Sequence, residues 1–219
     1  MVQQAKLFFR EMNKMVLLLR FLSILIVCFT TAVFAGTVPE YTADIINFDP
    51  DGNEEGITKV FSSEGKVCFE MPQQDVIGAM SIIVRPDLEK MFIVISDKSL
   101  YMEMPYYEKN GEFPRIIPMP DMPVPKIAKE EAGEEKINGY NTKKIFVTIT
   151  TDMNGQEVSW TNVEWKAEEF DIPIRSEDED GSVTELHNIK LVSVPKSKFD
   201  VKTDGLQQID NFMQLFELQ

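Results

Sequence analysis

Residues 81–105 read SIIVRPDLEKMFIVISDKSLYMEMP, and this stretch decides the fold. Three runs of β-branched, aromatic and methionine residues are separated by two short polar turns, Pro86-Asp87 and Asp97-Lys98, a pattern typical of strands. The middle run, residues 90–96, is apolar at odd and even positions alike. A strand of that kind lies inside a sheet, with other parts of the protein packed on both of its faces.

The strand pattern continues on both sides of this stretch. Further strands are predicted at residues 41–48, 57–62, 66–71, 80–84, 100–104, 143–151, 156–167, 172–177 and 182–194. Asn154-Gly155 and Asp180-Gly181 have the sequence of two-residue hairpin turns, so each should join antiparallel neighbours. The chain is therefore predicted to be mainly β (α+β), with a curved antiparallel sheet built as a meander.

Within residues 156–167 the apolar parity switches, from Val158 and Trp160 to Val163 and Trp165. A β-bulge, or a strand that bends across two parts of a curved sheet, would explain the switch. A curved sheet has a concave apolar face, and that face needs a cover.

Two segments are candidates for this cover. Residues 105–128 contain six prolines and many apolar side chains, which predicts an irregular flap lying against the sheet. Residues 205–219 follow the β domain at 36–204 and have apolar residues at helical spacing, which predicts a C-terminal amphipathic helix. We expect this helix to cover the core; a tail that binds a partner or a membrane is the alternative.

Residues 1–35 have the features of a cleaved secretory signal. Basic residues precede an uncharged apolar run at 21–33, and Val33 and Ala35 stand where signal peptidase accepts short side chains. We expect cleavage after Ala35 and a periplasmic location. Translation from Met12 or Met15 would give a more ordinary signal length.

Two other interpretations of this leader stay open. A retained membrane anchor would need a longer apolar run than Arg20 allows. Lipidation at Cys28 would make the chain a lipoprotein, but Val27 is not the small residue that usually precedes a lipidated cysteine, and Cys28 lies inside the apolar run.

The charge balance narrows the classes of partner. Of the 22 basic and 36 acidic residues, four and one fall in the leader, which leaves 18 and 35 and a net charge near −17. Nucleic acid and anionic head groups would be repelled by such a surface. Cys68 is the single cysteine after the leader, so we expect no internal disulfide and an inert, half-buried thiol.

No catalytic or metal-binding motif is found. His187 is the single histidine, and neither a G-x-S-x-G elbow nor a glycine-rich phosphate loop occurs. The acidic stretches at 49–55 and 177–181 lack the calcium-loop spacing and are interpreted as solvated turns. Met102 and Met104 offer thioethers suited to Cu(I), although methionine more often fills apolar surfaces. We expect no enzyme activity, no metal and no cofactor.

The chain resembles a domain-of-unknown-function family that shares the outer-membrane lipoprotein carrier (LolA-like) fold. The resemblance covers roughly residues 41–201, and its most specific part is the stretch at 81–105 quoted above. The other matching stretches are YTADIINF (41–48), KVFSSEGKVCFEMP (59–72), EKINGYNTKKIFVT (135–148), WKAEEFDIPIRSEDEDGSVTELHNIKLVSVP (165–195) and KFDV (198–201). Cys68 departs from the family, which often has a basic residue there, and the Pro/Met-rich segment is unusual.

The resemblance implies a half-open antiparallel β-barrel with a loop or helix plug on its apolar concave face. Members of the wider fold group bind acyl chains of lipids or lipoproteins, or act as envelope sensors. No catalytic residue carries over, because the matching motifs are not catalytic.

We therefore expect a soluble periplasmic protein that binds a hydrophobic ligand, such as an acyl chain, a lipid or a lipidated peptide. The predicted lining is Phe92, Val94, Met102, Met104, Ile116, Ile117, Met119, Trp160 and Trp165. The alternative is an envelope sensor or interaction protein with a filled core and a protein partner.

Overall fold

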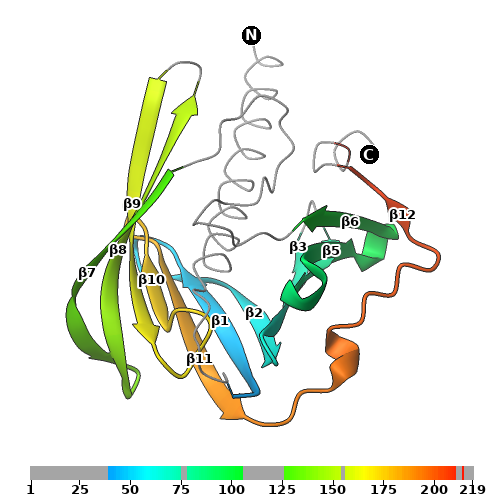
Figure 1. The fold of residues 1–219 in the computed structure, drawn as a ribbon, viewed down its shortest axis with the longest axis horizontal. Coiled ribbons are helices and arrows are strands. Elements are labelled where there is room, and N and C mark those ends of the chain that lie inside the picture. The colour runs from blue at the N-terminus through cyan, green and yellow to red at the C-terminus, as the bar shows by residue number, and fades with distance from the viewer. Residues whose placement is uncertain (1–38, 75–77, 106–125, 154–155, 211–213, 215–219) are drawn as a thin grey trace. The chain divides into compact units, whose positions relative to one another are not determined.

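A computed structural model describes residues 39–74, 78–105, 126–153, 156–210 and 214 (Figure 1). The twelve described strands belong to one sheet, in the order β12-β6-β5-β4-β3-β2-β1-β11-β10-β9-β8-β7. The strands are β1 (Tyr41–Phe48), β2 (Glu54–Ser63), β3 (Lys66–Gln74), β4 (Gly78–Arg85), β5 (Lys90–Ile95), β6 (Leu100–Pro105), β7 (Lys126–Ile137), β8 (Tyr140–Met153), β9 (Gln156–Ala167), β10 (Arg175–Glu177), β11 (Val183–Leu191) and β12 (Gln207–Gln208). Three short 3₁₀ turns, η1 (Pro86–Leu88), η2 (Ser96–Lys98) and η3 (Lys196–Lys198), complete the described elements.

The sheet consists of two antiparallel meanders, β1–β6 and β7–β11, which are joined by the pairing of β1 with β11. From β1 one meander runs through β2 to β6, and on its other side β1 pairs with β11, from which the second meander runs back to β7. Among the described strands every pairing is antiparallel except that of β12 with β6. The sheet is curved and does not close into a barrel (Figure 1). The predicted fold class, mainly β with a curved antiparallel sheet, is confirmed.

Tight turns fix the register of the hairpins. Glu64 (φ 52°) and Gly65 (φ 75°) both adopt positive φ between the paired Ser63 and Lys66, as a two-residue turn with the strands' twist requires. The predicted hairpin of β10 and β11 is confirmed, closed by a hydrogen bond of 2.9 Å from the Gly181 amide to the Asp178 carbonyl. β8 and β9 also pair as a hairpin, although their turn residues lie outside the described part.

The two faces of the sheet differ in what packs against them. The outer face of β2–β5 is covered by the chain that follows β11, which runs along it towards β12 (Figure 1). A buried cluster forms there, made of Cys68, Ile83, Phe92, Val194 and Phe199, with Phe61 and Val201 beside it. Side chains on the opposite or inner face include Met91, Ile93 and Ile95 of β5, all buried. The prediction that β5 packs on both faces is therefore confirmed.

Cys68 is more buried than predicted. Its side chain is 2% exposed, not half-buried, because the outer face at this point is covered by Phe199 and Val194. Burial, with the nearby Glu70 carboxylate as a smaller contribution, raises the pKa of this thiol to about 12. The thiol is consequently protonated and unreactive near neutral pH.

The chain beyond residue 204 differs from the helix predicted to begin at Gly205. Gln207 and Gln208 form β12, whose pairing with β6 is extended by a hydrogen bond of 2.9 Å from the Ile209 amide to the Tyr101 carbonyl. The edge of β6 satisfies backbone groups that a helix would have paired internally. Gln214 is helical, and the rest of the predicted helix lies outside the described residues.

The sequence pattern does not predict strand β7, and the first residues of this strand overlap the flap predicted at 105–128. The strand is long, charged and mostly exposed, and it forms one edge of the sheet. Charged side chains and the register shift between Glu131 and Gly133 are features that protect such an edge from pairing with other chains. Residues 106–125, which hold most of the flap, lie outside the described part.

Of the two explanations given for the parity switch in β9, the β-bulge is wrong. β9 pairs with β8 in one unbroken register from Thr142 opposite Ala167 to Met153 opposite Gln156. The parity switch has another cause: β9 presents polar side chains to the inner face, among them Asn162 and Glu164, while Trp165 lies on the outer face.

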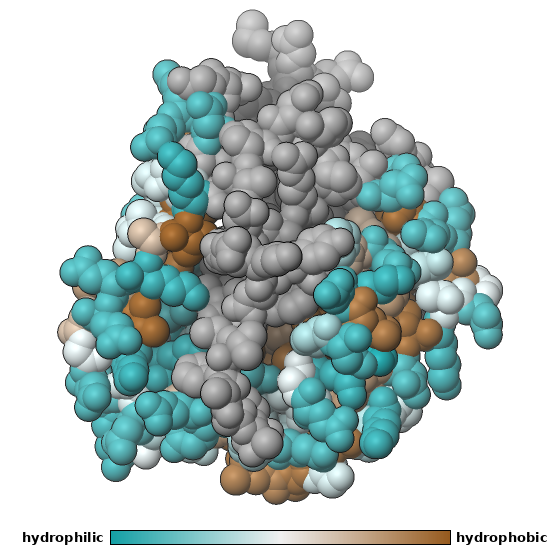
Figure 2. All heavy atoms as spheres, in the orientation of Figure 1, coloured by the Kyte–Doolittle hydropathy of each residue, from teal (hydrophilic) through white to brown (hydrophobic). Residues whose placement is uncertain are grey.

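The surface agrees with the acidic composition. Figure 2 shows a mostly hydrophilic coloured surface in this view, with apolar residues in small separate groups. Leu191 and Val192, which are 66% and 46% exposed, are accessible large apolar side chains at the end of β11. Such scattered exposure is ordinary for a folded protein.

Candidate ligand-binding face

The inner face of β3–β6 is rich in methionine. Cross-strand pairs place Met71 beside Met80 and Met91 beside Met104, and Met102 lies opposite Ile93. Because paired residues of neighbouring strands share a face, all five methionines point to the same side of the sheet. Each is at most 5% exposed.

Aliphatic and aromatic residues complete this apolar half of the inner face. One row runs across five strands, from Val60 through Phe69, Ile82 and Ile93 to Met102. Val67, Val84, Ile95 and Leu100 lie on the same face and are also buried. The strongest contacts among the described elements are those between neighbouring strands of the sheet.

The inner face becomes polar across β8 and β9. Successive pairs along these two strands are Ile149 with Trp160, Val147 with Asn162, Ile145 with Glu164 and Lys143 with Lys166. The inner face thus changes from apolar to charged over these four cross-strand pairs. Asn162, Glu164 and Lys166 are buried, and so is Ser176, which pairs with Glu164 from the side of β10.

A buried carboxylate connects the loop after β9 to the central strands. Asp171 accepts hydrogen bonds from the hydroxyls of Tyr41 on β1 and Ser62 on β2, the latter at 2.7 Å. Phe170 packs edge-on against Tyr41, with ring centroids 5.1 Å apart. These contacts hold residues 168–174 against the inner face at β1 and β2.

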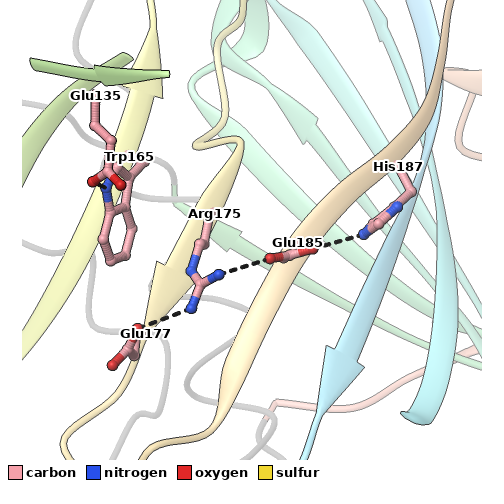
Figure 3. A network of polar contacts seen from close by, with 6 residues as sticks. All are labelled: Glu135, Trp165, Arg175, Glu177, Glu185 and His187. Carbon is pink, nitrogen blue, oxygen red and sulfur yellow. Dashed lines mark hydrogen bonds and ion pairs between the residues drawn. The ribbon is translucent and has the colours of Figure 1, made fainter. Parts of the chain in front are cut away.

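The outer face of β7–β11 has a separate polar network (Figure 3). Trp165 donates a hydrogen bond of 2.7 Å from its indole nitrogen to Glu135 of β7. Arg175 pairs with Glu177 and Glu185 at 3.1 and 3.0 Å. His187 lies 2.8 Å from the other oxygen of Glu185.

Cations flank the tryptophan of this network. Lys144 and Arg175 lie 4.9 and 5.2 Å from the Trp165 ring centroid, within cation–π range. The contacts link five consecutive strands across their outer face. They account for His187, whose partner is a carboxylate, as part of a structural network.

The nine predicted lining residues do not share one face. Met102, Met104 and Trp160 lie on the inner face. Phe92, Val94 and Trp165 lie on the outer face, where Phe92 belongs to the buried cluster and Trp165 to the polar network, so the prediction of one common lining is wrong for these three. Ile116, Ile117 and Met119 lie outside the described residues.

Sequence reasoning overlooked three of the five methionines on the inner face. Counted from the hairpin turns, Met71, Met80 and Met91 fall on the same side of the sheet as Met102 and Met104. The register set by the turns could therefore have identified them. Glu164 and Lys166 were hidden because a charged residue in a strand is ordinarily placed on the solvent side.

One carboxyl has an unusual acidity. Burial, helped by the charge of Asp180, raises the pKa of Asp178 to about 6 in the turn between β10 and β11. The described residues contain no group of three or more histidine, cysteine or acidic side chains that could hold a metal ion. Within the same residues, no helix has the length and hydropathy of a membrane span.

Comparison with known proteins finds similarity at the level of the fold. No protein-family model matches the chain, and no curated protein matches it either. Among solved structures, PNGF-II has a TM-score of 0.50 and 12% identity over 82% of this chain, which spans only 33% of that one. An uncharacterized conserved protein from Thermus thermophilus has a TM-score of 0.48 and 10% identity, with 80% and 91% of the two chains covered.

The lipoprotein LppX from Mycobacterium tuberculosis is also similar, with a TM-score of 0.33 and 11% identity over 70% of this chain and 88% of that one. The expected curved antiparallel sheet is confirmed. The open, curved antiparallel sheet is the architecture that the sequence resemblance implied.

Proposed function

We propose that the inner face of the sheet binds a hydrophobic ligand, such as an acyl chain, a lipid or a lipidated peptide, without catalysis. One observation carries the proposal: five methionines and their aliphatic neighbours lie together on one face of β3–β6.

Methionine suits this role for a physical reason. Its unbranched, polarizable side chain adapts to irregular apolar partners, and methionine-rich surfaces accommodate varied ligands. Burial of an acyl chain there would yield about 25 cal/mol for each Å² of apolar surface removed from water. Burial of apolar surface can therefore hold such a chain without any covalent step.

The carrier role in the envelope belongs to the same proposal. It is supported by the signal-like leader, whose residues lie outside the described part, and by the acidic composition. A protein exported in this way would present its inner face to lipids or lipoproteins in an aqueous compartment.

The test is to purify the full-length gene product from its own cells and to identify bound molecules by native mass spectrometry and lipid extraction. We expect a co-purifying lipid or acylated peptide. Met80→Asn and Met104→Asn should reduce the affinity for a fluorescent fatty acid about tenfold, because each places an amide in the apolar face.

Leu88→Asn is the matched control, since Leu88 is 48% exposed and lies outside this face. Its affinity should equal that of the unaltered protein. Absence of any co-purifying ligand, together with equal fatty-acid affinity in all these proteins, would overturn the proposal.

A further inference from the structure

The inner face of the sheet continues beyond β6 onto β12, the last described strand (Figure 1). In the parallel pairing of these two strands, Gln207 lies opposite Leu100 on the inner face. Side chains alternate between the two faces of a strand, so Ile209, two residues after Gln207, also lies on the inner face. Ile209 is 3% exposed. It extends the apolar inner face by one residue at this edge of the sheet.

The chain turns immediately after Ile209. The Asp210 amide donates a hydrogen bond of 2.9 Å to the side-chain oxygen of Gln214, and Gln214 is helical. A glutamine that accepts a bond from an amide about one turn earlier is a feature of helix starts. Residues 211–219 therefore begin at the edge of the inner face, beside β6.

The sequence of this last segment, NFMQLFELQ (211–219), is largely apolar. Phe212, Met213 and Phe216 recur at the spacing of one helix face, with Ile209 one turn before them. Glu217 is the single charged side chain of the segment. Exposure of such a face to water is unfavourable, so the segment needs an apolar surface within its reach.

The reach of the segment follows from the dimensions of helices and sheets. A helix over residues 211–219 would be about 14 Å long, and neighbouring strands lie about 4.8 Å apart. Such a helix can cross β6, β5 and β4, but it does not reach β3. These three strands carry Met80, Met91, Met102 and Met104, which belong to the proposed ligand-binding face.

We propose, on the basis of the function proposed above, that residues 211–219 dock on the inner face over β4–β6 and compete there with the hydrophobic ligand. Phe212 and Phe216 contact the same methionines that an acyl chain would contact. Binding of the ligand displaces the segment, so the measured affinity is lower than that of the uncovered face.

Methionine oxidation tests the docking without any ligand. The full-length protein is treated with hydrogen peroxide, and oxidised methionines are quantified by peptide mass spectrometry. In Phe212→Ser/Phe216→Ser, Met102 and Met104 should oxidise about fivefold faster than in the unaltered protein, because their cover is weakened. Met71 lies on β3, beyond the reach of the segment, and should stay protected.

Asn211→Ser/Glu217→Ser changes two polar positions of the same segment and is the matched control. Its oxidation should equal that of the unaltered protein. Unchanged oxidation of Met102 and Met104 in the first variant, or an equal rise at Met71, would overturn the docking. A tail that binds a protein partner or a membrane instead would give the unchanged result.

The competition is measured with dansyl-labelled undecanoic acid. Phe212→Ser/Phe216→Ser should bind this fatty acid about tenfold more tightly than the unaltered protein, and the control should bind it equally well. In the unaltered protein, saturation with the fatty acid should speed hydrogen exchange of the amides in residues 211–219. This measurement decides even if the variant fails to fold, and slower or unchanged exchange in the bound protein would overturn the competition.

The two proposals can fail separately. If none of these proteins binds the fatty acid, the proposed function is overturned, and with it the competition. The oxidation result still decides whether residues 211–219 dock on the inner face.

Discussion

At the scale of single residues, burial sets the chemistry of the few unusual groups. Cys68 and Asp178 are both driven towards their neutral forms, because an apolar surrounding disfavours charge. Asp171 is buried as well, and it accepts hydrogen bonds from two hydroxyl groups. The contacts of these three groups within the described residues are those of structural side chains.

Asp178 makes stability depend on pH. Its folded-state pKa of about 6 lies above the ordinary value of 3.8, so the folded state favours the protonated carboxyl. The stabilisation is fully present below pH 3.8 and is lost as the pH rises through about 6. Asp178→Asn should therefore raise the free energy of unfolding at neutral pH by about 1–3 kcal/mol and have little effect in acid.

Urea denaturation across this pH range measures the effect. Asp51→Asn, in the exposed turn between β1 and β2, is the control and should leave the pH dependence unchanged. An Asp178→Asn protein with the same pH dependence as the unaltered one would contradict the prediction.

At the scale of elements, the edge strand β7 depends on contacts made by its neighbours. Its own side chains are mostly exposed, and it pairs only with β8 in the described sheet. The hydrogen bond from Trp165 to Glu135 links it across β8 to β9. The Thr142 hydroxyl adds a second tie, a bond of 2.7 Å to the Glu135 carbonyl.

Removal of the Glu135 carboxylate should loosen this edge. In Glu135→Ala the indole N–H loses its acceptor, at a cost of about 1–2 kcal/mol. Hydrogen exchange of β7 amides should become faster, while exchange in β1 stays the same. Glu134→Ala, next in sequence and exposed, should exchange like the unaltered protein; equal rates in both variants would disprove the link.

The same strand shows why some elements were predicted and others were not. β1 and β9 were predicted with their observed bounds, because runs of alternating apolar residues and turn residues mark them locally. β7 has few apolar residues, although Asn138-Gly139 (φ 51° and 90°) is a hairpin turn that could have revealed it. β12 forms only because the edge of β6 is available, and such tertiary pairing has no local signal.

The candidate site was predicted in part for a related reason. Side-chain parity identifies which residues share a face within one strand, and Met102 with Met104 followed from it. Whether Phe92 or Met91 faces inward depends on which side the chain after β11 covers. The outward orientation of Phe92 depends on contacts with Val194 and Phe199, about 100 positions further along the chain. The local periodicity of apolar residues contains no information about such distant contacts.

At the scale of the whole molecule, the chain after β11 packs against the outer face of β2–β5 and stabilises it. Phe199→Ala should create a cavity beside Phe92 and Cys68 and lower the free energy of unfolding by about 3–5 kcal/mol. Cys68 should then react faster with a thiol reagent under native conditions, with the labelled site located by peptide mass spectrometry. Leu191→Ala, at a 66% exposed position, is the control and should leave both measurements unchanged.

The position of β1 in the middle of the sheet has a kinetic consequence. β1 is the first described strand of the chain, yet its second partner, β11, ends at Leu191. The two meanders cannot be joined until nearly the whole chain has emerged, and pairings of such high sequence separation form slowly. A growing chain of this topology therefore completes its sheet only once β11 is available to pair with β1.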